Sequence, residues 1–352
     1  MIVAEILRGL VGDKAANWDP IGLQLGDADA EASSVGVCHE VTNRVVEEAG
    51  DVDLLITYHP LLFRPIQRLR AGHGAEGRAL QLIKRGVNLA VVHTAWDAAP
   101  GGTADALAAT IGLTDVRSFG LIEPALRKKL VTFVPAEAVD AVTNALVDAG
   151  AGTIGKYRGC SFRSEGVGHF RPEIGASPTI GEVGEDEKVG EVRLEMLLGP
   201  GGTGAAVAAL VRSHPYEEPA FDLIETVSNA GLIGRVGTFE GNLADLTATL
   251  RSRLGSDPRI AIRAQEDVQR VAVLPGSGGS FIAEAAASGA DVYVTGDLSH
   301  HQFVEAADLG MSAIDVGHAA GEQPGVKALF DLVAKMVPDV IDLSYDPTPW
   351  QR

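Results

Sequence analysis

Six short apolar runs, rich in β-branched residues, recur along the chain and constrain its fold more than any other feature. They are VGVCHEV near residues 35–41, DLLIT at 53–57, NLAVV at 88–92, RVAVL at 270–274, DVYVT at 291–295 and SAIDV at 312–316. Unbroken runs of this kind are typical of strands buried on both faces of a largely parallel sheet. Between them lie segments with helical spacing, several of which end in Gly, where helices often stop. The alternation predicts an α/β fold.

The segment from Leu126 to about Asn229 has a different pattern. Its order is KKLVTFVP, AEAVDAVTNALVDAG, a Gly-rich and charged stretch, VRLEMLLG, GTGAAVAALVRSH and AFDLIET. This βαββαβ-like succession is typical of a small α+β domain of the ferredoxin-like kind. We therefore expect an inserted domain at residues 126–229. Residues 1–125 and 230–352 are then two α/β halves that pack together as one unit.

Length and charge exclude several classes of protein. With 352 residues, the chain is long enough for two or three domains at ~100–200 residues each. It holds 47 Asp and Glu against 29 Lys and Arg, a formal charge of -18, which disfavours a nucleic-acid partner. No apolar stretch reaches the ~18 residues of a membrane span. The only two cysteines, Cys38 and Cys160, lie far apart, so a reducing, cytoplasmic location is the simpler expectation.

Histidines and carboxylates follow four of the predicted strands. Because the carboxyl ends of strands form the ligand-binding edge of an open α/β sheet, these side chains are expected to meet there. The residues are Tyr58 and His59, His93 and Asp97, Asp297 and His301, and His318 and Glu322.

This mixture of side chains favours a metal site. Imidazole and carboxylate suit zinc, manganese, iron or nickel, and a carboxylate can bridge two cations. A single His at a strand end is more often a hydrogen-bonded structural residue, but four such occurrences together favour ligands. His318 and Glu322, spaced i and i+4, share a face if a helix begins directly after the strand.

Two further motifs leave alternatives open. PGSGGSF at residues 275–281 is either an anion-binding loop or a plain strand-to-helix turn. HPYEEP at residues 214–219 groups a His with two carboxylates, but its prolines favour a rigid turn over a ligand site.

Several motifs resemble those of a known family. WDPIGLQLGD at 18–27, ITYHPLLF at 56–63, HTAWDAAPGG at 93–102, VTGDLSHHQ at 294–302 and VGHAAGE at 316–322 are similar to segments of the GTP cyclohydrolase 1 type 2 homologs, the Nif-three-like dinuclear metal-centre proteins. YRGCSF, GHFRPEIGASPTIG and HPYEEPAFD resemble the insert of the longer bacterial members. The matches span essentially the whole chain, in order.

The resemblance implies a toroidal homohexamer with two divalent cations per chain, whether Zn, Mn, Fe, Ni or Mg, and a PII/CutA-like insert. The implied metal ligands are His59, Asp97, His318 and Glu322, with Glu322 as the bridge. Tyr58 stands where some members carry a second histidine, and a neutral phenol is a weak ligand at neutral pH.

The resemblance also gives the other candidate residues and the function. His93, Asp297 and His301 match motif positions at the margin of the site and are candidates for supporting the ligands or transferring protons. The implied activity is metal-assisted hydrolysis of a nucleotide or related phosphate compound by activated water. The alternative is a non-catalytic metal-binding or regulatory ring that senses a small ligand through its insert.

Overall fold

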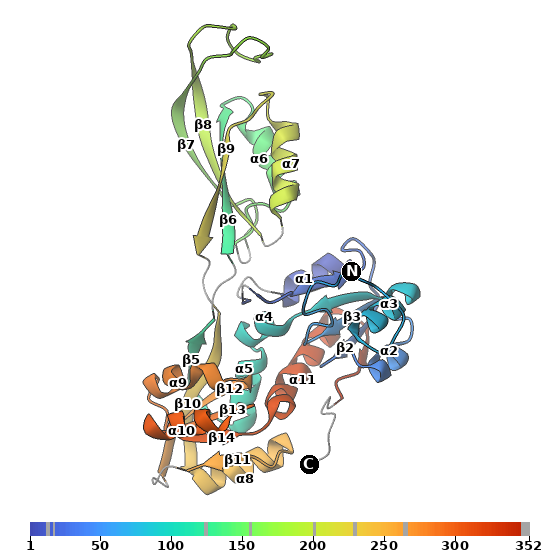
Figure 1. Cartoon of the computed structure of the whole chain (residues 1–352), viewed down its shortest axis with the longest axis vertical. Coiled ribbons are helices and arrows are strands. Elements are labelled where there is room, and N and C mark those ends of the chain that lie inside the picture. The colour runs from blue at the N-terminus through green and yellow to red at the C-terminus, as the bar shows by residue number, and fades with distance from the viewer. Residues whose placement is uncertain are drawn as a thin grey trace. The chain divides into compact units, whose positions relative to one another are not determined.

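The computed structural model describes residues 1–11, 15–16, 18–122, 126–154, 157–199, 202–227, 231–262 and 267–345 (Figure 1). The chain divides into two compact units. One unit combines Met1–Glu123 with Ala230–Arg352, and the other is Pro124–Asn229.

The first unit contains two sheets. The five-stranded sheet has the order β1-β4-β3-β2-β15, in which β1 is antiparallel to β4 and the other neighbours are parallel. Its strands are β1 (Gly22–Leu25), β2 (Ser34–Cys38), β3 (Leu54–Thr57), β4 (Asn88–Val91) and β15 (Asp339–Asp342). Every residue of β3 and β4 is buried, as their uninterrupted apolar runs predict.

The six-stranded sheet has the order β11-β14-β13-β12-β10-β5, with a parallel centre formed by β12, β13 and β14. Its strands are β5 (Thr114–Leu121), β10 (Leu232–Asn242), β11 (Arg259–Ala261), β12 (Asp267–Ser277), β13 (Val292–Gly296) and β14 (Ser312–Asp315). The strands at its two ends are antiparallel to their neighbours.

The helices of this unit include one that packs against both sheets. They are α1 (Val3–Leu10), α2 (Asn43–Ala49), α3 (Ala75–Arg85), α4 (His93–Ala98), α5 (Thr103–Ile111), α8 (Leu243–Leu254), the 3-10 turn η1 (Gly279–Phe281), α9 (Ile282–Ala287), α10 (His300–Asp308) and α11 (His318–Met336). Helix α11 packs against β2 and β15 of one sheet and β12 and β13 of the other. Leu329 of α11 shares a core with Val35 and Ile56, while Leu107 of α5 shares one with Val273. Residues from the N-terminal and C-terminal segments of this unit therefore share the same hydrophobic cores.

The second unit has one four-stranded antiparallel sheet in the order β7-β8-β6-β9. Its elements are β6 (Leu126–Pro135), α6 (Val139–Asp148), β7 (Ser161–Phe170), β8 (Glu187–Leu198), α7 (Thr203–Ser213) and β9 (Phe221–Val227). The two helices bury apolar residues such as Leu146 and Leu210 against Leu194 of the sheet.

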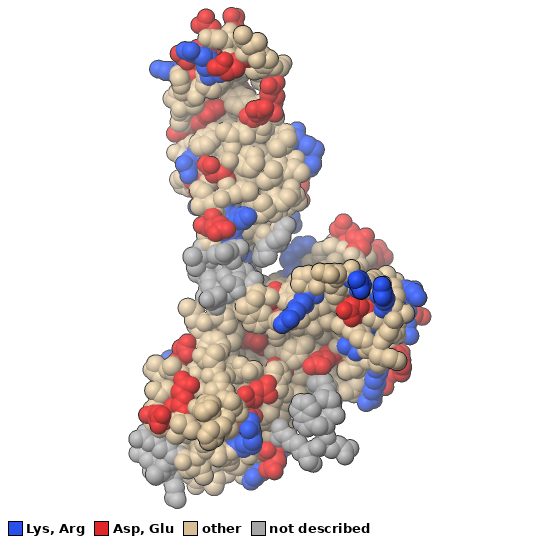
Figure 2. Space-filling model, viewed as in Figure 1, with Lys and Arg blue, Asp and Glu red and all other residues tan. Residues whose placement is uncertain are grey.

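The structure confirms the mixed α/β class predicted from the sequence, with three sheets. All six apolar runs contain strands at the predicted places, although β12 is longer than its run. Among the described residues, no helix is long and apolar enough to span a membrane. On the face shown in Figure 2, the described Lys and Arg side chains are interspersed with Asp and Glu and form no continuous basic surface.

Candidate metal centre

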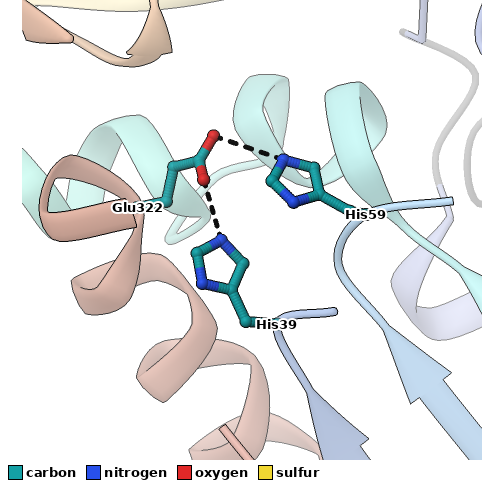
Figure 3. Close-up of side chains that lie close together, drawn as sticks. All are labelled: His39, His59 and Glu322. Atoms are coloured by element: carbon teal, nitrogen blue, oxygen red, sulfur yellow. Dashed lines mark hydrogen bonds and ion pairs between the residues drawn. The ribbon is translucent and has the colours of Figure 1, made fainter. Parts of the chain in front are cut away.

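Three imidazoles surround the carboxylate of Glu322, which projects from the first turns of α11 and is 3% exposed. Its Oε2 lies 2.8 Å from Nε2 of His39. Its Oε1 lies 3.1 Å from Nε2 of His318 and 3.6 Å from Nε2 of His59. Figure 3 shows the rings of His39 and His59 pointing at the two oxygens of this one carboxylate.

The ends of neighbouring parallel strands place His39 and His59. His39 directly follows β2, and His59 follows β3 by two residues. The His59 N–H donates to the His39 carbonyl at 3.0 Å, and the Thr57 hydroxyl donates to the His59 carbonyl at 2.9 Å. The two rings consequently stack, with centroids 5.0 Å apart and planes 20° from parallel.

The other two groups come from α11, which begins at His318 directly after β14 and its turn. Buried Asp315 shapes that turn, because its carboxylate accepts hydrogen bonds from the N–H groups of Gly317, at 2.8 Å, and Leu298, at 3.0 Å. Helical geometry then brings His318 and Glu322 together at the predicted i, i+4 spacing.

This donor set fits a divalent cation. Ligand atoms of His39, His59 and Glu322 all lie within 4.8 Å of one another. Nδ1 of His39 is buried without a hydrogen-bond partner among the described residues. Gly276 also leaves room for the carboxylate, since a Cβ there would lie 2.4 Å from Oε1 of Glu322. Imidazole nitrogen with carboxylate oxygen is a donor set of zinc and related ions.

Glu322 and the rings of His59 and His318 also shift one another's pKa values. Burial favours the neutral acid of Glu322, but hydrogen bonds from His318, His39 and His59 outweigh it and hold its pKa well below the usual range. Burial likewise opposes charge on the imidazoles, yet contact with Glu322 raises the pKa of His59 to about 10 and that of His318 to about 9. Without a cation, protons therefore balance the buried negative charge.

Asp97 and Tyr58 lie beside this group and bond to each other. The buried Tyr58 hydroxyl donates to Oδ1 of Asp97 at 2.6 Å. Burial, followed by the negative charge of Asp97, raises the pKa of Tyr58 well above its usual value, so the phenol stays neutral. Burial also raises the pKa of Asp97 to about 6, and the charge of Glu322 contributes to that rise. Asp97 is outside the His39, His59 and Glu322 group.

His93 and Asp297 are each part of a histidine–carboxylate pair at the margin. Nδ1 of His93 lies 2.8 Å from Oδ1 of Asp19, and Nδ1 of His318 lies 2.6 Å from Oδ2 of Asp297. Both His93 and Asp297 have positive φ, at 27° and 58°. Such conformations are uncommon outside glycine and concentrate at functional sites.

His301 is placed differently from the other candidates. It lies on exposed α10, and its ring contacts His300 at a centroid distance of 5.5 Å. No hydrogen bond or ion pair within the described part of the chain joins His301 to the cluster.

His39, which is 1% exposed and bonded to Glu322, is not among the site residues predicted from the sequence. The apolar run near residues 35–41 predicts a strand over its whole length, whereas β2 ends at Cys38. His39 therefore follows a buried strand, as the other candidates do. The expectation that ligands follow the carboxyl ends of strands identifies His39 once β2 is ended at Cys38.

Comparisons with known proteins find similar sequences and structures over nearly the whole chain. A family model described as Duf34/NIF3 (NGG1p interacting factor 3) matches residues 3–349. A Bacillus subtilis (strain 168) protein named GTP cyclohydrolase 1 type 2 homolog is 39% identical over 314 residues, covering 87% of this chain and 84% of the relative. A Mycobacterium tuberculosis protein of the same name is 39% identical over 321 residues, covering 88% and 84%. A Bacillus cereus protein related to NIF3 has a crystal structure that matches with a TM-score of 0.64 and 31% identity, covering 99% of this chain and 98% of that one.

Proposed function

Because the chain belongs to the Duf34/NIF3 family, as its motifs indicate, we propose that it is a metal-dependent hydrolase of a nucleotide or related phosphate compound, with two divalent cations per chain. The observation that carries the proposal is the convergence of His39, His59 and His318 on buried Glu322. A buried carboxylate facing three imidazoles is costly unless cations or protons balance it.

In this proposal, the cluster around Glu322 would hold the first cation, and Asp97 with Glu322 would hold the second. The support for a second position is electrostatic, because burial raises the pKa of Asp97 and the nearby negative charge of Glu322 adds to that rise. A bound divalent cation supplies Lewis acidity and lowers the pKa of water.

The protein's own proton-transfer group in this proposal is His93. Asp19, whose side chain is fully buried, bonds to Nδ1 of His93 and also accepts from the Thr94 N–H at 3.0 Å. That bond fixes the ring and leaves Nε2 to take up or release a proton. The ring centroid of His93 lies 5.2 Å from that of His59, so the proton that His93 transfers would be carried next to the cluster.

An aromatic pair beside the cluster supports a substrate with a planar base. Trp18 is 56% exposed, Phe63 is 50% exposed, and their ring centroids lie 5.8 Å apart. Trp18 also lies 6.0 Å from the ring of His93. Exposed aromatic faces stack on nucleobases without requiring a particular sequence or base, so Trp18 and Phe63 would bind the base while the cluster binds the phosphate.

The proposal extends to assembly and to the insert. The βαββαβ connectivity and the sheet order β7-β8-β6-β9 support a ferredoxin-like insert of the PII/CutA kind. Family membership supports the toroidal homohexamer, since homo-oligomers favour closed symmetry. Light scattering tests the assembly, and a monomer mass at micromolar concentration would contradict it.

The test of function is a turnover assay of the metal-loaded protein with GTP, other nucleotides and phosphoesters. We expect metal-dependent turnover that Glu322→Gln and His93→Ala remove. We expect Trp18→Ala to raise KM for nucleotides while leaving KM for small phosphoesters unchanged. Stoichiometric metal binding without turnover of any of these substrates would contradict the hydrolase and favour the regulatory ring.

A further inference from the structure

A cavity of about 770 Å³ lies within the second unit, and none of its lining residues belongs to the metal centre. Strands β7 and β8, the loop after β7 and the HPYEEP turn form its walls. Two contacts hold that loop to the turn. The Thr179 hydroxyl donates to the Pro215 carbonyl at 2.7 Å, and the Ser177 N–H donates to Glu217 at 3.1 Å. The cavity has the size and the preformed walls of a small-molecule site.

Glu191 of β8 is the buried charge of this cavity. It is 8% exposed, and its Oε1 accepts a hydrogen bond from the Tyr216 hydroxyl at 2.9 Å. Among the described residues, no Lys, Arg or His forms an ion pair with it, and no donor bonds to Oε2. Gly168 on β7 makes room for this carboxylate, because a Cβ there would lie 2.1 Å from Oε2.

The charges around the cavity leave this carboxylate uncompensated. Five glutamates and two arginines line it. Both arginines are bonded to other carboxylates. Arg193 donates to Glu195 at 2.8 Å, and Arg171 donates to both oxygens of Asp186 at 2.9 and 2.5 Å. The cavity therefore attracts a cation and repels an anion.

The remaining walls are aromatic and apolar. Phe133, Phe170 and Tyr216 contribute their side chains, and the rings of Phe170 and Tyr216 have centroids 6.0 Å apart. Aromatic faces favour both apolar groups and cations. The buried carboxylate of Glu191 among these rings is therefore complementary to a ligand that carries a positive charge on an apolar or aromatic group.

We propose that this cavity binds a small organic cation, an amine or guanidinium attached to an aromatic or apolar group, with the charged nitrogen donating to Oε2 of Glu191. Tyr216 positions the carboxylate through Oε1, Gly168 gives the carboxylate its place against β7, and Oε2 is left without a donor among the described residues. The site shares no residue with the metal centre, and the proposal does not rest on the proposed hydrolase activity.

The test compares 2-phenylethylamine with 2-phenylethanol, which has the same shape without the charge, in calorimetric titrations of the full-length protein at pH 7. We expect the amine to bind at least about tenfold more tightly than the alcohol, as a charge-assisted hydrogen bond requires. Glu191→Gln should remove this preference while retaining the bond from Tyr216. Gly168→Ala, which keeps the charge but displaces the carboxylate, should weaken amine binding as well.

Two controls complete the design. Glu218→Gln changes an exposed carboxylate at the rim and should leave amine affinity within about threefold, because exposed charges contribute little. His39→Ala should leave it unchanged, which separates this site from the metal centre. Equal binding of amine and alcohol, no binding of the amine at millimolar concentration, or unchanged amine affinity in Glu191→Gln would each overturn the proposal.

Discussion

Asp297 and His318 form a hydrogen bond of 2.6 Å between Oδ2 and Nδ1, which directs Nε2 of the same ring to within 3.1 Å of Oε1 of Glu322. Asp297 holds this position with a φ of 58°, a conformation that costs energy outside glycine. The bond fixes the ring and raises its basicity, as carboxylates behind metal-binding histidines do.

Asp297→Asn should lower metal affinity by about 10–100-fold without unfolding the protein, because an amide orients the ring less well. Competition with a chelating indicator measures the affinity. The matched control is Asp308→Asn at the exposed end of α10, which should leave it unchanged. Equal affinities for the two variants would show that Asp297 does not support a ligand.

His39→Ala should lose metal, whereas His301→Ala should retain it. His39 bonds to Glu322 in the buried cluster, and His301 lies on the exposed face of α10. Elemental analysis after dialysis measures metal per chain for each variant, with circular dichroism to check folding. Metal loss in His301→Ala alone would reverse the assignment of these two histidines.

Metal affinity should rise with pH between about pH 6.5 and 8.5. In the metal-free protein, the raised pKa values of His59, about 10, and His318, about 9, keep both rings protonated in this range. A cation must displace those protons, so binding releases up to about two protons and lowering the pH weakens it. Calorimetry in buffers of different ionisation enthalpy counts the protons. Binding without proton release at pH 7.5 would contradict the protonated cluster.

Gly276→Ala should reduce metal binding, because its Cβ would displace Oε1 of Glu322 and its φ is +66°. Gly255→Ala is the matched control, with a φ of +62° and open space around the added Cβ. Both variants should lose about 1–2 kcal/mol of stability from the left-handed backbone. Thermal unfolding measures this loss, and only Gly276→Ala should also lose metal. Equal metal contents would show that the glycine is needed for its backbone alone.

The sequence predicts the strands well because their burial on both faces leaves unbroken apolar runs, as in β3 and β13. It also predicts the His318–Glu322 pairing, since that depends only on helical spacing after a strand. Within PGSGGSF, Gly276 makes room for Glu322, and anion binding by this loop stays a prediction. The rigid-turn interpretation of HPYEEP agrees with the bond between Nε2 of His214 and the Phe133 carbonyl, at 3.0 Å.

Tertiary contacts explain what the sequence did not predict. His39 belongs to the cluster because α11, nearly three hundred residues later, brings Glu322 against the end of β2. The VTGDLSHHQ motif contains both His301 and Asp297 and does not tell which of them contacts the metal centre. The packing of α10 decides this, because it places His301 on the exposed face of the helix. The aromatic cavity around Glu191 depends on a loop folding back onto the HPYEEP turn, which no periodicity predicts.

The most direct test of the metal centre is metal per chain, by elemental analysis after dialysis, in wild type and Glu322→Gln. The substitution keeps the shape of the side chain but removes the charge that three imidazoles face. We expect the wild type to retain divalent metal and Glu322→Gln to lose nearly all of it, with unchanged circular dichroism. Wild-type metal content in both Glu322→Gln and His318→Ala would contradict the site and leave the cluster as a structural hydrogen-bond network.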